Sequence, residues 1–281
     1  MSAPLPEPSA DDGVLVYRDV TYRAVVGFRP LSLDLFKPEQ HGPTPVVIAL
    51  HGGAFRVGSR SMYPPAFGAP EVFRRLAHDG TCVASVDYRL SGEATWPACV
   101  HDVMAAISWL RARSSELGID PERIGLWGES AGAYLALMTA LSSPTDDGLT
   151  VGALPGVRCA VAWYPPVDFS TMQAQGAPAT DAAGSPESHL LGVPVGDARE
   201  RARRASPVNY LSVDSVPILL MHGTADDAVP FAQSEQLVSA AAQVGAPVEL
   251  SAVADYGHTF RGHRDPAGLQ RTALDFLLRH L

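Results

Sequence analysis

Residues 124–141, IGLWGESAGAYLALMTAL, contain the stretch that decides the fold, Gly128-Glu129-Ser130-Ala131-Gly132. This pentapeptide fits G-x-S-x-G, in which small flanking residues allow a sharp turn that presents a serine hydroxyl. The apolar run before it predicts a strand, and the run after it predicts a helix over 131–141. A glycine-rich helix start in which Ser130 only caps the helix would fit the same local pattern. The motif therefore gains its meaning from partners elsewhere in the chain.

Two later loops contain those partners in the order typical of α/β-hydrolases, Ser, then Asp, then His. Asp226 and Asp227 follow the predicted strand at 218–221, and His258 follows the predicted strand at 248–253. A serine hydroxyl needs a base and an orienting acid to act as a nucleophile. Because ligands bind beyond the carboxyl ends of parallel strands, all three groups are expected at one edge of the sheet.

Neighbouring residues compete for two of these roles. Adjacent residues of an extended segment point to opposite sides, so only one of Asp226 and Asp227 can face the imidazole. His263, five positions after His258, is the main rival as general base, and we interpret it as a solvated loop residue. His51 is interpreted as a residue that holds its own turn.

That turn, His51-Gly52-Gly53-Ala54-Phe55, follows the apolar run VVIAL and is rich in glycine. Its backbone N–H groups can point into a site and, with the N–H of Ala131, form an oxyanion hole. An ordinary strand-to-loop turn is the alternative interpretation. Apolar and aromatic residues after strands predict a partly apolar substrate pocket, although each could equally belong to the core: Phe55, Trp163, Tyr164, Phe169 and Phe260.

Short apolar runs alternate with helical patterns along the chain, which predicts a largely parallel sheet with helices on both faces. Strands are expected near 14–17, 22–26, 31–36, 46–50, 81–86, 124–127, 160–163, 218–221 and 248–253. Helices are expected over 71–78, 97–117, 131–141, 231–244 and 267–280. We expect residues 1–20 to form an N-terminal tail and first strand, and residues 21–281 to form a single domain.

Residues from about 170 to 200 interrupt this alternation, because they are rich in Ala, Gly, Pro, Ser and Thr. We interpret them as a small lid-like insertion that is mobile and only lightly packed. A loose cover of this kind favours esters with short acyl chains of about two to six carbons, or small aromatic esters, over long lipids. A passive surface insertion with no role in selectivity is the alternative interpretation.

Composition restricts the partners. With 21 basic and 30 acidic residues the formal net charge is −9, which argues against binding to nucleic acid or anionic lipid. No Cys/His metal spacing or membrane-spanning apolar run is present in the sequence, and no metal or cofactor is expected. The three cysteines lie in apolar or helical stretches, and residues 1–14 lack the pattern of a signal peptide. We therefore expect a cytoplasmic protein that acts on small molecules; the oligomeric state cannot be read from the sequence.

Five segments together resemble one protein family over nearly the whole chain after about residue 20. They are HGGAFRVGSR (51–60), VASVDYRLSGEATWPACVHDVMAAISWLR (83–111), GIDPERIGLWGESAGAYLALMTAL (118–141), SPVNYLSVDSVPILLMHGTADDAVP (206–230) and YGHTF (256–260). They are similar to α/β-hydrolase carboxylesterases of the feruloyl/acetyl-xylan-esterase-like branch, BD-FAE, and its hormone-sensitive-lipase-like relatives. The turn at 51–55 departs from the HGGGW form of such proteins at Ala54 and Phe55.

The resemblance implies an α/β-hydrolase fold and a role for each matching position. Ser130 would be the nucleophile, Asp226 the acid, and His258 the base. The residues implied as oxyanion donors are Gly53, Ala54 and Ala131, while Asp102 and Arg89 fall in segments that serve as scaffold.

The function predicted from these observations is a serine carboxylesterase that hydrolyses small acyl esters through an acyl-enzyme. An amide or formamide hydrolase, or a small peptidase, could use the same three residues. A ligand receptor on the same fold that does not catalyse is a further alternative, although such a protein would be expected to lose one of the three.

Overall fold

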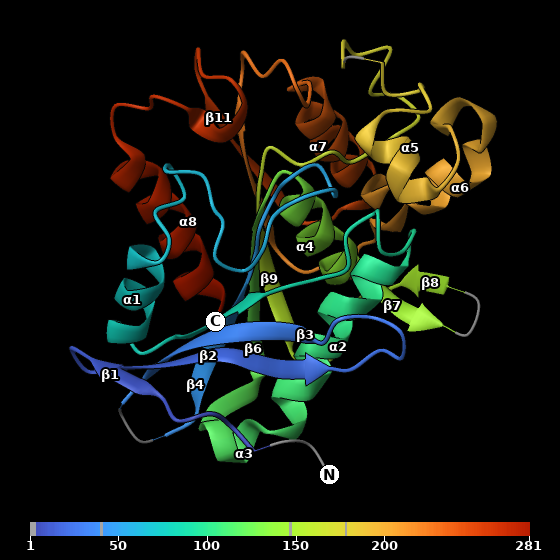
Figure 1. Ribbon diagram of the computed structural model, residues 1–281. Helices are drawn as coiled ribbons and strands as arrows, with labels where there is room; N and C mark the ends of the chain where they lie inside the picture. Colours follow the sequence, from blue (N-terminus) through green and yellow to red (C-terminus); the bar gives the residue numbers. More distant parts are fainter. Residues whose placement is uncertain (1–3, 40–41, 146–147, 178) are drawn as a thin grey trace.

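The computed structural model describes residues 4–39, 42–145, 148–177 and 179–281, in which a nine-stranded sheet forms the centre (Figure 1). The strand order is β1-β2-β3-β5-β4-β6-β9-β10-β11. Strands from β5 to β11 in this order pair in parallel, whereas β1, β2 and β3 pair antiparallel with their neighbours. The strands of this sheet span Ser9–Asp11 (β1), Val14–Arg23 (β2), Leu31–Pro38 (β3), Thr44–Leu50 (β4), Cys82–Val86 (β5), Ile119–Glu129 (β6), Val157–Trp163 (β9), Ile218–Gly223 (β10) and Val248–Val253 (β11).

Helices cover both faces of the sheet, as predicted (Figure 1). On one face lie α1 (Glu71–His78) and α8 (Pro266–His280), and on the other lie α2 (Ala98–Ala112), α4 (Ala131–Leu141) and α7 (Ala232–Val244). The central strand β4 shows why two cores form, because successive side chains of a strand point to opposite faces. Its Val46, Ile48 and Leu50 join the core beneath α2 and α4, while Val47 and Ala49 join the core beneath α1 and α8.

Several element boundaries differ from the sequence prediction. The strands expected at 14–17 and 22–26 are one strand, β2, which continues past the tail boundary expected at residue 20. Its pairing with β3 shifts register twice, which explains the break in the alternating pattern. The helix expected over 97–117 is divided into α2 and the short α3 (Ser114–Leu117). A small hairpin of β7 (Ser142–Thr145) and β8 (Gly148–Val151) was not predicted.

The segment from about 170 to 200 is better packed than its composition predicts. It contains α5 (Pro186–Leu191) and a 3₁₀ turn at Val195–Asp197, and it leads into α6 (Arg199–Arg204). The side chains of Met172, Leu190, Leu191 and Val195 are buried in the core shared with α2 and α4. The expectation of light packing was therefore wrong, because small residues bring the chain close to the body while a few large apolar side chains anchor it.

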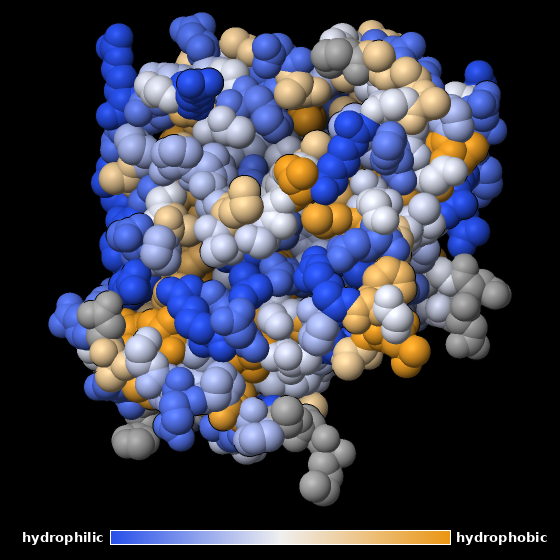
Figure 2. All heavy atoms as spheres, viewed as in Figure 1, coloured by the Kyte–Doolittle hydropathy of each residue, from blue (hydrophilic) through white to orange (hydrophobic). Residues whose placement is uncertain are grey.

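Figure 2 shows hydrophobic side chains in small separate groups on a mostly hydrophilic face. Among the described residues, no helix combines the length and the apolar character needed to cross a membrane.

Cys82, Cys99 and Cys159 are buried free thiols, and burial raises the pKa of each to about 12. These thiols therefore stay protonated at neutral pH.

A buried carboxylate ties α2 to the sheet. Asp102 of α2 has a fully buried side chain and accepts hydrogen bonds from the Arg89 guanidinium at 2.7 and 2.9 Å. Arg23 of β2 donates to the same carboxylate at 2.7 Å. Removing one member of such a cluster leaves buried charge without compensation. This agrees with the scaffold role that the resemblance implied for Asp102 and Arg89.

We predict that Asp102→Ala lowers the free energy of unfolding by about 3 kcal/mol, because two arginines lose their buried partner. Urea denaturation followed by circular dichroism measures this change. A loss below about 1 kcal/mol would show that the cluster does not fix α2 to the sheet.

Candidate active site

Ser130 sits at the sharp turn between β6 and α4. Its backbone has φ 52° and ψ −117°, and its N–H donates to the Trp163 carbonyl at 2.9 Å. A Cβ on Gly128 would overlap the Gly132 carbonyl, and a Cβ on Gly132 would overlap the carbonyls of Leu50 and His51. The two glycines of the motif are therefore required by close backbone approach, and the turn presents the serine at the carboxyl edge of the sheet.

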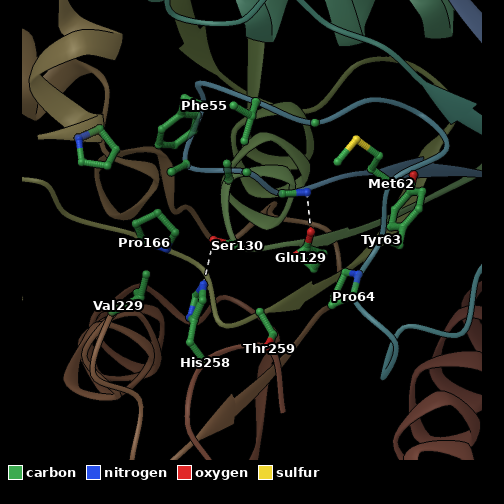
Figure 3. A pocket seen from close by; sticks show the side chains of 18 of the residues that line it. Phe55, Met62, Tyr63, Pro64, Glu129, Ser130, Pro166, Val229, His258 and Thr259 are labelled. Carbon is green, nitrogen blue, oxygen red and sulfur yellow. Dashed lines mark hydrogen bonds between the residues drawn. The ribbon is translucent and has the colours of Figure 1, made fainter. Parts of the chain in front are cut away.

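His258 lies within hydrogen-bond reach of both predicted partners, and Figure 3 shows its contact with Ser130. Its Nε2 is 3.0 Å from Ser130 Oγ, and its Nδ1 is 2.7 Å from Asp226 Oδ2. A carboxylate only accepts, so Nδ1 carries the proton and the lone pair of Nε2 faces the hydroxyl. His263, the rival, contacts Tyr256 and accepts from the Asp265 N–H instead.

Asp226 is fixed on both oxygens. Its Oδ1 accepts from the N–H groups of Ala228 and Val229, each at 2.9 Å, and its side chain is fully buried. Burial opposes ionisation, but hydrogen bonds with His222 and His258 outweigh it and hold the pKa of Asp226 well below its usual range. Asp227 is exposed and takes no part in this arrangement. The structure thus brings Asp226, and not Asp227, to the imidazole.

His222 is a second histidine on Asp226 that the sequence did not single out. Its fully buried ring places Nε2 3.0 Å from the Val229 carbonyl and 3.3 Å from Asp226 Oδ2. Because the carbonyl and the carboxylate only accept, Nε2 is the protonated nitrogen, and Nδ1 accepts from the Ser234 hydroxyl at 2.7 Å. His222 therefore fixes the position of the acid that orients His258.

The turn after β4 supplies backbone donors. Gly53, Ala54 and Phe55 have φ values of 112°, 53° and 62°, and the Gly53 carbonyl accepts from the N–H groups of Arg56 and Val57. Ala54 thus adopts the left-handed conformation that glycine adopts more readily than alanine. Within the described ranges, the N–H groups of Gly53, Ala54 and Ala131 donate to no protein acceptor. All three residues line the same cavity as Ser130.

His51 holds this turn, as predicted from the sequence. Its ring stacks on Tyr88, and its Nδ1 donates to the Gly52 carbonyl at 2.7 Å. Burial lowers the pKa of His51 to about 4, so it is neutral at physiological pH.

Ser130 lines a cavity of about 670 Å³, and the other lining side chains lie on two sides of the serine (Figure 3). Phe55, Pro166 and Val229 lie on one side, and Met62 and Tyr63 lie on the other. Pro186 and Glu187 of α5 also line it, so the segment 170–200 forms part of its wall. Among the described residues, no group of His, Cys, Asp and Glu side chains could hold a metal ion.

Phe55 is the one predicted pocket aromatic that lines this cavity. Trp163 and Phe260 are fully buried and pack on each other in the core instead. Tyr164 is also buried, and its ring packs on His258 from outside the cavity, with ring centres 4.6 Å apart. The prediction that these three residues line the substrate pocket was therefore wrong; of the three, Tyr164 packs against the base.

Glu129, directly before Ser130, is a site residue that sequence reasoning missed. It is buried, lines the cavity, and accepts a hydrogen bond from the Gly52 N–H (Figure 3). Burial raises the pKa of its carboxyl group to about 7, although Gly52 and His258 act in the opposite direction. The sequence does show a carboxyl group inside the G-x-S-x-G motif. Its partner Gly52 lies 77 residues away, so no local pattern indicates the contact.

Comparison with known proteins places this geometry in a family. A family model described as BD-FAE matches residues 33–241, which is more than half of the chain. The chain belongs to the BD-FAE family. Its fold is that of the α/β-hydrolases, as the resemblance implied.

Proteins similar to this chain carry the names of esterases. The probable carboxylic ester hydrolase LipM of Mycobacterium tuberculosis is 30% identical over 244 residues, which cover 82% of this chain and 54% of LipM. Esterase LipQ of the same organism is 30% identical over 236 residues, which cover 78% of this chain and 52% of LipQ. The chain thus spans about half the length of these curated relatives. A solved truncated form of a carbohydrate esterase from gut microbiota superposes with a TM-score of 0.80 at 26% identity, covering 98% of this chain and 99% of that one.

We predict that Glu129→Gln stabilises the protein more at pH 8 than at pH 5. The folded-state pKa of about 7 lies above the ordinary 4.5, so the stability contributed by the protonated carboxyl is complete below pH 4.5 and is lost as pH rises through 7. Full ionisation costs on the order of 3 kcal/mol, which the amide avoids. Urea denaturation of both proteins across this pH range measures the difference. A difference that does not change with pH would contradict the raised pKa.

Proposed function

We propose that this chain is a serine carboxylesterase that hydrolyses small acyl esters, with Ser130 as nucleophile, His258 as general base and Asp226 as the orienting acid. The observation that carries the proposal is the unbroken series of hydrogen bonds from Asp226 through His258 to Ser130 Oγ, facing a cavity with free backbone donors. The esterase relatives support the same reaction class.

The first half of the reaction forms an acyl-enzyme. Ser130 Oγ attacks the ester carbonyl carbon while its proton passes to His258 Nε2. Asp226 stabilises the resulting imidazolium, and the N–H groups of Gly53, Ala54 and Ala131 donate to the oxyanion. The intermediate collapses when the carbon–oxygen bond to the alcohol breaks and His258 Nε2 returns the proton to the leaving oxygen.

The second half releases the acid. A water molecule loses a proton to His258 Nε2 and adds to the acyl carbon, and the same three N–H groups bind the second oxyanion. Collapse breaks the bond to Ser130 Oγ, which takes the proton back. None of these steps requires a metal ion or an organic cofactor, since the side chains and backbone described supply every proton transfer.

The proposed substrates are esters with short acyl chains or small aromatic acyl groups. Pro186 and Glu187 close one side of the cavity, which supports the role of segment 170–200 as a cover for the acyl group. We also propose that the protein acts in the cytoplasm, where its three buried thiols stay reduced.

Ser130→Ala is predicted to lower ester turnover by about 10⁶-fold while the protein stays folded, because the three residues act as a unit. A panel of p-nitrophenyl esters from acetyl to decanoyl, beside the matching anilides, measures the activity. The wild-type enzyme should hydrolyse the esters in the range from acetyl through hexanoyl faster than the longer esters up to decanoyl. It should cleave the anilides far more slowly than the esters. Residual activity of more than a few per cent in the variant would refute the mechanism, and faster anilide cleavage would indicate an amidase.

Substitution of the two neighbouring carboxylates separates their roles. Asp226→Asn is expected to lower kcat by about 10⁴-fold, because an amide fixes the wrong tautomer of His258. Asp227→Asn is the matched control and should leave kcat within about twofold of wild type, since surface carboxylates contribute little. The reverse ranking in the same p-nitrophenyl acetate assay would exclude Asp226 as the acid.

A further inference from the structure

The Glu129 carboxyl group connects two neighbouring strand ends at the site. Glu129 is the last residue of β6, and Gly52 follows the end of β4, its partner in the parallel sheet. Glu129 Oε1 accepts the Gly52 N–H, while the rest of the buried side chain faces the cavity (Figure 3). The carboxyl group therefore touches the turn that carries two of the proposed oxyanion donors.

This turn needs such a restraint. Gly53, Ala54 and Phe55 in succession adopt positive φ, which L-residues rarely adopt and which costs free energy at Ala54 and Phe55. On its far side, the Gly53 carbonyl accepts from Arg56 and Val57. On its near side, the Gly52 N–H is held by Glu129 and the Gly52 carbonyl by His51. The Gly53 N–H shares a peptide plane with the Gly52 carbonyl that His51 holds, and the Ala54 N–H shares one with the Gly53 carbonyl. Glu129 fixes the preceding plane, that of the Gly52 N–H, from which these two planes continue.

We propose that Glu129 is a positioning residue that aims the Gly53 and Ala54 N–H groups at the developing oxyanion by holding the Gly52 N–H. This inference rests on the proposed function. The role requires an acceptor oxygen and no charge, so the protonated acid or an amide fulfils it equally.

The surroundings of Glu129 favour the neutral form. The titratable groups that face it are His258, Tyr164, Tyr63 and Tyr88; Tyr164 and Tyr88 are buried and Tyr63 is partly buried, and desolvation raises the pKa of each tyrosine, so all three are neutral. Only His258 in this set becomes cationic, when it takes the Ser130 proton. Burial keeps the pKa of Glu129 near 7, so a large share of the carboxyl is protonated at neutral pH.

The test compares Glu129→Ala with Glu129→Gln. E129A is expected to lower kcat by about 10- to 100-fold and to leave KM within about twofold of wild type. Misdirected donors stabilise the transition state less, while binding of the ground-state ester stays the same. E129Q should stay within about threefold of wild type. The Ki of a trifluoromethyl ketone, which forms a tetrahedral adduct with the serine, should rise in E129A by the same factor as kcat/KM falls. General destabilisation of the fold would not produce this proportionality.

A second comparison tests the contact itself. The heavy atoms nearest to a Cβ placed on Gly52 all belong to the Glu129 side chain. Gly52→Ala should therefore lower kcat in the wild-type background and change it little further in the E129A background. Gly92→Ala is the matched control, because a Cβ there meets no atom within 4 Å.

The outcomes separate this inference from the proposed function. An active wild-type esterase whose E129A variant keeps its kcat and its ketone affinity would overturn the inference alone. The same holds for an E129A variant that loses activity without weakening ketone binding, or for an E129Q variant as impaired as E129A. A folded wild-type protein without esterase activity would overturn both.

Discussion

The backbone of Ser130 adopts φ 52° and ψ −117°, a conformation that costs a serine about 1 to 3 kcal/mol and that the surrounding structure must impose. Gly128 and Gly132 allow β6, α4 and the end of β4 to approach so closely that no side chain fits between them. The hydrogen bond from the Ser130 N–H to the Trp163 carbonyl ties the turn to β9. This single turn determines the positions of the Ser130 hydroxyl, the Ala131 N–H and the Glu129 side chain.

Electrostatics complete the site around that turn. Asp226 stays ionised in a buried place because two backbone N–H groups and two histidines donate to it. His222, held in one tautomer by a carbonyl and a serine hydroxyl, donates to the same Asp226 oxygen as His258 and so holds the acid in place. The opposite holds at Glu129, where burial favours the neutral acid beside the same imidazole. Two carboxyl groups near one histidine thus differ in pKa, because Asp226 accepts from two backbone N–H groups and two histidines whereas Glu129 is desolvated and accepts from the Gly52 N–H.

The sequence predicts those parts of the site that depend on local patterns. The glycine-flanked Ser130 and the chain order of the acid and base come from motifs a few residues long, and the structure brings these side chains together. The role of Glu129 depends on a partner 77 residues away, which no local pattern indicates. Trp163 and Phe260 follow strands as pocket residues do, but their rings turn into the core between the sheet and α8. For the segment near 170–200, small residues predict mobility, whereas close packing around Met172 and Leu190 decides its structure.

The most direct test of the account is covalent labelling of the native protein with a fluorophosphonate, followed by intact-mass measurement and peptide mapping. The account predicts one phosphonyl adduct per chain, located on Ser130, and none after Ser130→Ala substitution. Such an adduct needs a serine whose proton a neighbouring base removes and an oxyanion that backbone donors stabilise. No adduct on the folded wild-type protein, or an adduct on another residue, would contradict the central claim that Ser130 is an activated nucleophile.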